Sequence, residues 1–469
     1  MFLKRMRRTA AVAAVLGFVT VGASCSDDTQ AMSPDKGMTK DSGSDQKTPD
    51  GMMKPDGSAL GTIVDVAAGN PDFSTLVAAL TKAGLVDTLK GAGPFTVFAP
   101  NNKAFTDSGI TDLSAVPVDD LKKILLYHVL ATKAIAKDVK SGPVTSAADL
   151  TIFIGTPGGV ELNGGNSVKG GAKVIATDVM ASNGVIHVID RVILPPDIPT
   201  CATYGGLKEL VKAVGAAAEI SAGTSVLKAL QGPGPFTVFA PTDAAFKALS
   251  PAPTDPAVIR DVLLYHVVGA KVLSSGIPAK ADSILKNTWG NGVTLLFSTT
   301  GGAKVNGAAV ALADVKCTNG VVHVIDKVLL PPNIVDMVGI AGLAELGKAV
   351  GAAAPISAGV TVADALKAKE PYTVFAPTDA AFKALSPAPT DPALIRNVLL
   401  LHVVKAAAPV TSGKLPAAAV DSLLAGEKLT FSSTGPTVSS DGAQGAKIGP
   451  ADIHVTNGVI HVIDKVLLP

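Results

Sequence analysis

One segment of the sequence occurs three times, and this repetition constrains the fold more than any other feature. NGVIHVIDRVILPP begins at Asn183, NGVVHVIDKVLLPP begins at Asn319 and NGVIHVIDKVLLP begins at Asn457. Successive copies start 136 and 138 residues apart. That spacing is the size of a domain, whereas solenoid repeats are roughly 20 to 50 residues long. The chain of 469 residues is therefore predicted to contain three successive copies of one domain.

Two further motifs precede this closing segment in each copy. The first is FTVFAP at Phe95 and Phe236, which becomes YTVFAP at Tyr372. The second is an apolar run with a histidine near its end, which reads ILLYHVL, VLLYHVV and VLLLHVV in the three copies. The segment TVFAPTDAAFKALSPAPTDPA at Thr237 recurs unchanged at Thr373. A duplication is the simplest account of the second and third copies.

The pattern within one copy predicts helices first and strands later. LKELVKAV, which begins at Leu207, has the apolar spacing of a helix, and FTVFAP is a short apolar strand that ends at a proline. Thr242 or Asp243 can cap the helix that follows. Asp255 suits the N-cap of the next helix, and Pro256 suits its first position. Short β-like runs broken by Gly and Asn fill the second half, so an α+β fold is predicted.

The order FTVFAP, then Tyr-His, then NGVIHVID resembles the fasciclin-type domain, often written FAS1. The resemblance covers nearly all of the chain from about Ala59, three times over. It implies three tandem fasciclin-like domains, each a β-wedge or sandwich with packed α-helices, over residues 59–197, 198–333 and 334–469. It also implies cell adhesion or matrix contact as the usual role. The Tyr-His pair is present as Tyr127–His128 and Tyr265–His266, but Leu401 replaces the tyrosine before His402.

The N-terminus has the features of a targeting signal. Basic residues at positions 4 to 8 precede an apolar stretch from Ala10 to Ala23, which is short for a membrane span. The stretch ends in GASC and resembles a bacterial lipobox, so residues 1–24 are predicted to be a lipoprotein signal peptide and Cys25 the lipidated residue. Residues 25–58 are polar and predict a flexible tether. Ser26 favours the outer membrane, and ordinary secretion is the alternative; either places the protein outside the cytoplasm.

Composition excludes several classes of function. The chain is 47% hydrophobic, which is too apolar for a disordered protein. Its formal net charge is +1, so nucleic acid is not an expected partner. Only 4% of residues are aromatic, which argues against a sugar-stacking cleft. The expected partners are proteins or polysaccharides on a cell surface or in a matrix, with membrane contact through the N-terminal lipid.

Beyond Cys25 the sequence has two cysteines, Cys201 and Cys317, and both lie in the second repeat. Neither of the other repeats contains a cysteine. In an oxidising compartment this joint occurrence favours a disulfide over two free thiols. Sequence does not give the Cα distance that a disulfide needs, so both readings remain open.

The histidines are the residues with the most chemical potential. The closing segments hold the pairs His187–Asp190, His323–Asp326 and His461–Asp464. Residues three apart in a strand face opposite ways, so these pairs are not expected to form dyads. A half-buried histidine bonded to backbone is favoured over a general base, and the aspartates are expected to accept backbone N–H groups. The Asn-Gly pair before each strand indicates a turn, since both residues tolerate positive φ.

The second set, His128, His266 and His402, follows an apolar helical run in each copy. A buried histidine with a polar partner is favoured over a metal ligand, because HExxH and CxxC do not occur. GxSxG is also absent. No catalytic residue, metal or cofactor is therefore predicted. The expected function is a non-enzymatic surface interaction protein; the alternatives are a passive envelope spacer and a hydrolase that uses His128 or His266.

Overall fold

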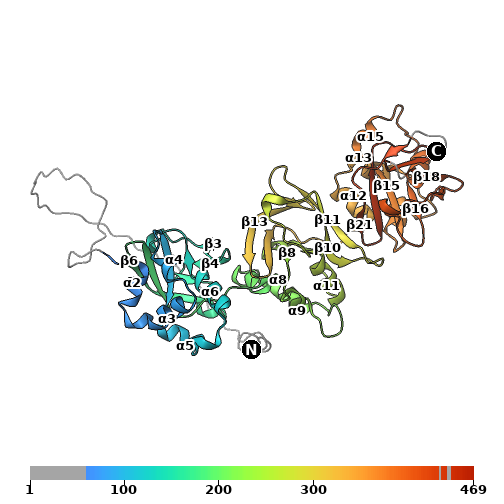
Figure 1. Ribbon diagram of the computed structural model, residues 1–469. Helices are drawn as coiled ribbons and strands as arrows, with labels where there is room; N and C mark the ends of the chain where they lie inside the picture. The colour runs from blue at the N-terminus through green and yellow to red at the C-terminus, as the bar shows by residue number, and fades with distance from the viewer. Residues whose placement is uncertain (1–59, 433–434, 441–444) are drawn as a thin grey trace, which may run out of the picture. The chain divides into compact units, whose positions relative to one another are not determined.

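The computed structural model describes residues 60–432, 435–440 and 445–469 (Figure 1). The signal peptide, Cys25 and the tether that the sequence predicts lie outside these residues. The described chain divides into two compact units, and residues 60–139, 158–160 and 172–193 form the first. Residues 140–157, 161–171 and 194–469 form the second. In the described ranges no helix is both long enough and apolar enough to cross a membrane.

Each repeat begins with three short helices that lead into a strand. In the first repeat these are α2 (Ile63–Ala68), α3 (Ser74–Lys82), α4 (Val86–Lys90) and β1 (Phe95–Pro100). In the second they are α7 (Ile198–Tyr204), α8 (Lys208–Ala216), α9 (Val226–Leu230) and β8 (Phe236–Pro241). In the third they are α12 (Ile334–Ile340), α13 (Ala344–Ala352), α14 (Val362–Lys367) and β15 (Tyr372–Pro377).

Two helices and a short strand follow in each repeat: α5 (Asn102–Asp107), α6 (Val118–Tyr127) and β2 (Val129–Leu130); α10 (Asp243–Ala248), α11 (Pro256–Tyr265) and β9 (Val267–Val268); α15 (Asp379–Lys383), α16 (Pro392–Leu401) and β16 (Val403–Lys405). The caps form as the sequence predicts. Thr242 accepts a hydrogen bond from the backbone N–H of Ala245, and Asp255 accepts one from that of Ala257.

Strands make up the rest of each repeat. They are β3 (Gly142–Thr145), β4 (Thr151–Gly155), β5 (Glu161–Leu162), β6 (Ala172–Ala181) and β7 (Gly184–Ile189) in the first repeat. The second has β10 (Lys280–Lys286), β11 (Gly292–Ser298), β12 (Lys304–Val305), β13 (Ala308–Cys317) and β14 (Gly320–Ile325). The third has β17 (Val420–Asp421), β18 (Lys428–Ser432), β19 (Thr437–Ser440), β20 (Ala446–Lys447), β21 (Ile453–Val455) and β22 (Gly458–Ile463). Helices early and strands late confirm the predicted α+β class.

The first and last strands of each repeat pair in parallel. Phe236 lies opposite Gly320 at the start of the β8–β14 pair, and Pro241 lies opposite Ile325 at its end. The pairs β1–β7 and β15–β22 have the same register. The last strand is antiparallel to the strand before it, so it occupies the middle of its sheet. The repeated segment is therefore the closing strand of each repeat.

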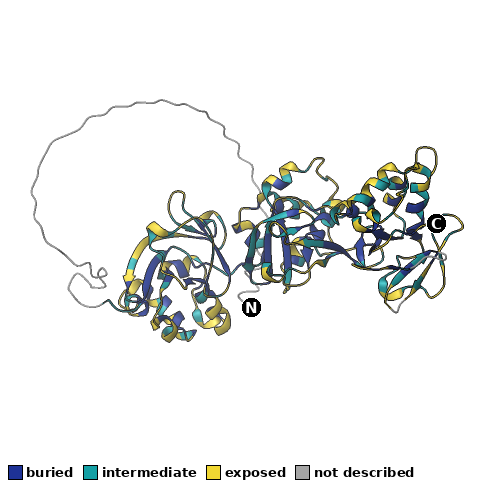
Figure 2. Cartoon of the chain, turned by 90° about the horizontal axis from the view of Figure 1, so that it is seen from above, coloured by how far each residue is buried: buried dark blue, intermediate teal, exposed yellow. Residues whose placement is uncertain are grey.

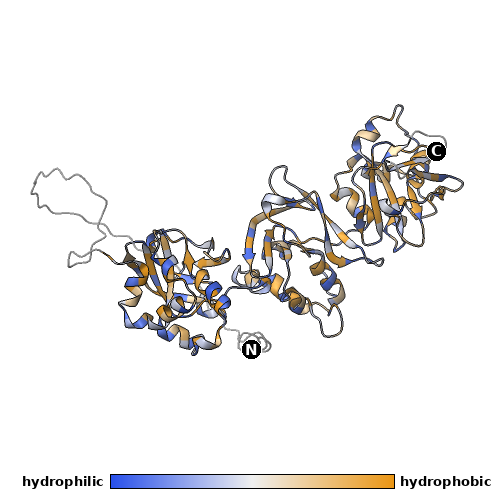
Figure 3. Cartoon of the chain, in the orientation of Figure 1, coloured by the Kyte–Doolittle hydropathy of each residue, from blue (hydrophilic) through white to orange (hydrophobic). Residues whose placement is uncertain are grey.

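The sheets differ in how far they close. In the second repeat the order β10-β11-β12-β13-β14-β8-β9 forms a closed barrel. In the third repeat the described strands form two four-stranded sheets, β16-β15-β22-β21 and β17-β18-β19-β20. Buried residues lie along the strands and on parts of the helices (Figure 2), and apolar residues are frequent in the same elements (Figure 3). The core thus lies between the early helices and the sheet that the closing strand completes.

Candidate functional site

The histidine that follows the long helix is buried and fully hydrogen-bonded in every repeat. The Nδ1 atom of His266 lies 2.7 Å from the carbonyl oxygen of Val262, and its Nε2 accepts a bond of 2.9 Å from the N–H of Leu329. His128 and His402 make the same pair of contacts. Because a backbone N–H donates to Nε2, the ring proton belongs on Nδ1. The ring therefore joins the helix end to the exit from the closing strand.

Burial also removes the basicity of these rings. Desolvation lowers the pKa of His128, His266 and His402 to about 4, and the bond to the helix carbonyl offsets it only in part. A ring of that kind has no free nitrogen for a substrate. This geometry supports the structural interpretation of the three residues and argues against a hydrolase based on His128 or His266.

The histidines of the closing strands are held in a second repeated arrangement. The Nε2 atom of His323 lies 2.9 Å from the carbonyl oxygen of Val272, and its Nδ1 accepts a bond from the N–H of Asp314. Its ring stacks on Phe239 with centroids 5.5 Å apart. His187 and His461 make equivalent contacts. These rings anchor a loop to the sheet and have no exposed face for catalysis.

The aspartate three residues after each closing-strand histidine makes a separate structural contact. Asp326 accepts a bond of 2.7 Å from the N–H of Ala309 on β13. Asp190 and Asp464 accept bonds of 2.8 and 2.7 Å from the N–H groups of Lys173 and Lys447. The histidine and the aspartate of each pair thus bond to different segments, in agreement with strand alternation.

The asparagine of the closing segment has a role that sequence reasoning missed. Its Oδ1 accepts from the first helix of its own repeat, and its Nδ2 donates to two carbonyls just before the first strand. For Asn319 these partners are the N–H of Ile198 at 3.0 Å and the carbonyls of Leu230 and Gly232 at 2.7 and 2.8 Å. Asn183 and Asn457 make the equivalent three bonds. We call this arrangement the asparagine clamp.

The turn that the Asn-Gly pair predicts is present, because Ser182–Asn183, Thr318–Asn319 and Thr456–Asn457 are turn residues directly before the closing strands. None of Asn183, Asn319 and Asn457 has a positive φ. The glycine is required for a different reason: a Cβ on Gly320 would lie 2.0 Å from the carbonyl oxygen of Phe236 on the parallel strand. The same approach occurs at Gly184 and Gly458. Close backbone contact therefore selects glycine here.

The tyrosine of the Tyr-His pair belongs to the core. The Tyr265 hydroxyl donates to the carbonyl of Thr294 at 2.9 Å and accepts from Asn306. Burial raises the pKa of Tyr265. Tyr127 and Leu401 are also fully buried at the equivalent position. The change to Leu401 thus replaces one buried side chain with another and removes no exposed group.

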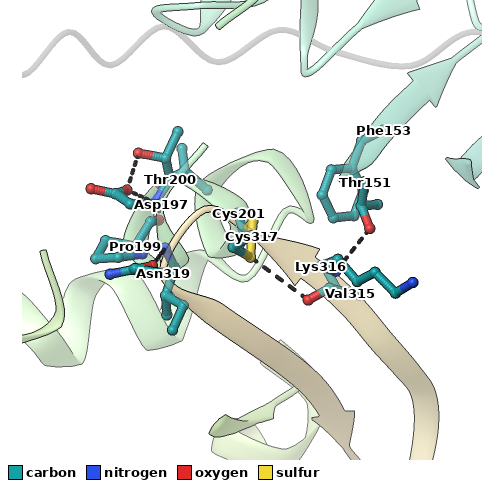
Figure 4. The surroundings of a disulfide bond; sticks show 12 residues. Thr151, Phe153, Asp197, Pro199, Thr200, Cys201, Val315, Lys316, Cys317 and Asn319 are labelled. Atoms are coloured by element: carbon teal, nitrogen blue, oxygen red, sulfur yellow. Dashed lines mark hydrogen bonds between the residues drawn. A yellow bond between two sulfur atoms is a disulfide. The ribbon is translucent and has the colours of Figure 1, made fainter. Parts of the chain in front are cut away.

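Cys201 on α7 and Cys317 at the end of β13 form a disulfide, with Cα atoms 6.4 Å apart (Figure 4). The bond joins the first helix of the second repeat to the strand that precedes its closing strand. Within the described residues no group of three or more His, Cys, Asp or Glu side chains could hold a metal ion.

An apolar cavity of about 190 Å³ lies under the helices of the third repeat. Its walls come from α12, α13, α14, β15 and α16, and they include Gly339 and Gly347. The space beside both glycines is open. None of the described residues that line the cavity is charged, and the histidine among them, His402, is already hydrogen-bonded. These walls supply packing contacts.

A pair of exposed apolar residues recurs in the second and third repeats. Ile220 and Val258 are 38% and 46% exposed, and their counterparts Ile356 and Leu394 are 39% and 43% exposed. Ile220 begins a tight turn closed by its own N–H and the carbonyl of Thr224. We call these two pairs the apolar patches.

The backbone holds the two members of each apolar patch on neighbouring segments. The N–H of Ala218 bonds to the carbonyl of Pro256 in the second repeat, and that of Ala354 bonds to Pro392 in the third. Both bonds tie the turn to the first turn of the long helix. The first repeat has no such turn, because only residues 83–85 separate α3 from α4. The patches are thus a feature of two repeats out of three.

Comparisons with known proteins follow the same division of the chain. The family model of the fasciclin domain matches residues 71–195, 208–331 and 353–469. Protein sll1483 of Synechocystis is 51% identical over 140 residues, which are 29% of this chain and 74% of that protein. Transforming growth factor-beta-induced protein ig-h3 of Sus scrofa is 29% identical over 405 residues, 85% of this chain and 56% of that protein.

Two further matches are more distant. Human periostin is 25% identical over 431 residues, 87% of this chain and 48% of that protein. The chain therefore spans about half the length of ig-h3 and periostin. A solved FAS1 domain pair from the insect cell adhesion molecule fasciclin I aligns with a TM-score of 0.36 at 18% identity, and the alignment covers 56% of this chain and 98% of that one.

Proposed function

Since the chain belongs to the fasciclin domain family, we propose that it is a non-enzymatic interaction protein that attaches to cells, matrix or envelope polymers. The observation that carries the proposal is the duplication of the apolar patch on the second and third repeats. The family's usual role in adhesion or matrix contact supports the same function. The partner is a protein or polysaccharide with an apolar surface of its own.

Two equal patches on one chain suit attachment through weak contacts. When one patch is bound, the second meets its partner at a high effective concentration, so overall affinity exceeds that of either patch. Exposed isoleucine, valine and leucine contribute by burying apolar area, at about 25 cal/mol per Å². The two repeated histidine arrangements contribute stability to the repeats that present these patches.

We further propose that the protein is extracytoplasmic and held at the cell envelope by a lipid on Cys25. The disulfide between Cys201 and Cys317 supports this location, because disulfides persist in oxidising compartments. Labelling of cells with a radioactive fatty acid tests the anchor, since Cys25→Ala would abolish the label. Retention of the label in that variant would contradict the assignment.

Attachment of cells that produce the protein tests the function. A strain that lacks it is complemented with the wild type, with the double variant Ile220→Asp and Ile356→Asp, or with Leu330→Asp. Leu330 is a matched control, since it is an apolar residue 50% exposed outside the patches. Wild type and control should restore attachment, and the double variant should not. Equal attachment by all strains would instead favour a passive spacer.

A further inference from the structure

Strand β4 of the first repeat contacts the second repeat through a threonine. The side-chain hydroxyl of Thr151 accepts a bond of 2.9 Å from the backbone N–H of Lys316, next to Cys317 (Figure 4). Phe153, two residues later, packs against the core of the second repeat. The Lys316 ammonium forms an ion pair with Asp149. We call this contact the first joint.

The second and third repeats meet through an equivalent contact. The hydroxyl of Thr294 on β11 accepts a bond of 3.0 Å from the backbone N–H of His454. Leu296, two residues after Thr294, packs against the core of the third repeat. His454 and Lys316 are equivalent, because each stands three residues before its clamp asparagine. We call this contact the second joint.

Further hydrogen bonds close the second joint. The side chain of Asn287 donates to the carbonyl of Val455 at 3.1 Å. The Lys280 ammonium donates to the carbonyls of Ala451 and Asp452. All of these acceptors are backbone atoms beside His454. The joint therefore depends on the position of the strand that carries this histidine.

The ring of His454 in this joint has a nitrogen atom without a hydrogen bond. His454 is 9% exposed, and its Nδ1 atom has no hydrogen-bond partner among the residues that the structure describes. Burial lowers the pKa of His454 from its usual value, although Asp282 and Asp452 oppose this effect. The other charged or titratable groups that act on it are Lys280 and Lys286 of β10 and His461 of β22. Both lysines disfavour a further positive charge.

We propose that the second joint is a pH-dependent switch that is closed while His454 is neutral and opens when its ring is protonated. A protonated ring would bring a charge and a second N–H donor into an interface with no acceptor at Nδ1, whereas separation of the repeats would expose both to water. At the first joint the equivalent residue is Lys316, which has no imidazole ring and forms an ion pair with Asp149. That joint should therefore not respond to mild acid.

The direction follows from proton linkage. The closed joint lowers the pKa of His454 below the ordinary value of 6.5, so the open form binds the proton more readily. Closure is thus fully favoured above pH 6.5 and weakens as pH falls below it. One proton changes the ratio of open to closed forms by at most about tenfold per pH unit.

The chain has its own probe for this switch. Trp289 is its one tryptophan, and its backbone N–H bonds to Asn287, the residue that reaches Val455 across the joint. Tryptophan emission of the full chain is recorded from pH 8 to pH 5, together with its radius of gyration from small-angle X-ray scattering. In the wild type, a red shift and a larger radius should appear together below pH 6.5.

The variant His454→Asn is the matched control, because asparagine keeps the backbone N–H but does not titrate. In this variant the red shift and the increase in radius that are caused by protonation of His454 should be absent. Changes caused by other histidines, such as His266 and His323, would still occur. Identical pH responses in the two proteins, or no response in the wild type, would overturn the proposal. If the variant is already open at pH 8, titration of His454 in the wild type by NMR tests the proposal instead. The proposal requires a pKa of His454 below 6.5 and an increase in radius at the pH where His454 titrates.

Discussion

Removal of the asparagine clamp in the second repeat is the most informative single substitution. Asn319→Ala deletes three hydrogen bonds and leaves the N–H of Ile198 and the carbonyls of Leu230 and Gly232 without their partner. At about 1 kcal/mol net for each bond, the loss is about 3 kcal/mol. Polar groups that stay buried without water would raise the cost to about 5 kcal/mol.

Trp289 lies in the second repeat, so its fluorescence follows the unfolding of that repeat in urea. With a slope of about 2 kcal/mol per M, a loss of about 3 kcal/mol lowers the midpoint by about 1.5 M. Asn291→Ala, which removes an asparagine side chain from a turn in the same repeat, should shift it by less than about 0.3 M. If the urea midpoint of Asn319→Ala also differs from that of the wild type by less than about 0.3 M, the clamp is not a stabilising element.

Three other perturbations test separate parts of the structure. Between pH 7.5 and pH 5, protonation of His266 in the unfolded chain should lower the stability of the second repeat by about 2 kcal/mol, because the pKa of His266 falls from 6.5 to about 4 on folding. This contribution to stability is complete above pH 6.5 and is lost toward pH 4. The same loss in the variant His266→Gln would contradict this assignment. Reduction of the Cys201–Cys317 disulfide should lower the stability of the second repeat alone by about 2 to 4 kcal/mol, which the tryptophan fluorescence detects. An equal loss of stability in the third repeat, measured by calorimetry, would contradict a local effect of the disulfide. Gly347→Ala, in open space within α13, should stabilise the third repeat by about 0.5 to 1 kcal/mol, and a lower calorimetric midpoint would show that the cavity wall does not tolerate a methyl group.

The sequence predicted those features that depend on local pattern. Helical spacing and the Asp255–Pro256 start located α11, and strand alternation separated His323 from Asp326. The threefold recurrence identified β7, β14 and β22 as closing strands before their partners were known. Each of these inferences uses residues that are close together in the chain.

Features that depend on distant contacts could not be predicted in this way. The partners of Asn319 lie about 90 and 120 residues away, so the sequence indicates its place in a turn but not the bonds of its side chain. Gly320 was assigned to the same turn, whereas the carbonyl of Phe236 excludes a larger residue. The two joints depend on Thr151 and Thr294, which no motif marks. The recurrence of ISAG at Ile220 and Ile356 was the available signal for the apolar patches.

We propose above that two equal apolar patches make this chain a bivalent attachment protein. The most direct test of this proposal is the dissociation rate of the fluorescently labelled chain from cells to which it attaches. Either Ile220→Asp or Ile356→Asp alone should speed dissociation by about 10²-fold or more, because one remaining patch has no avidity. The double variant should show no specific retention. Single variants that dissociate as slowly as the wild type, or a double variant that is still retained, would contradict the account.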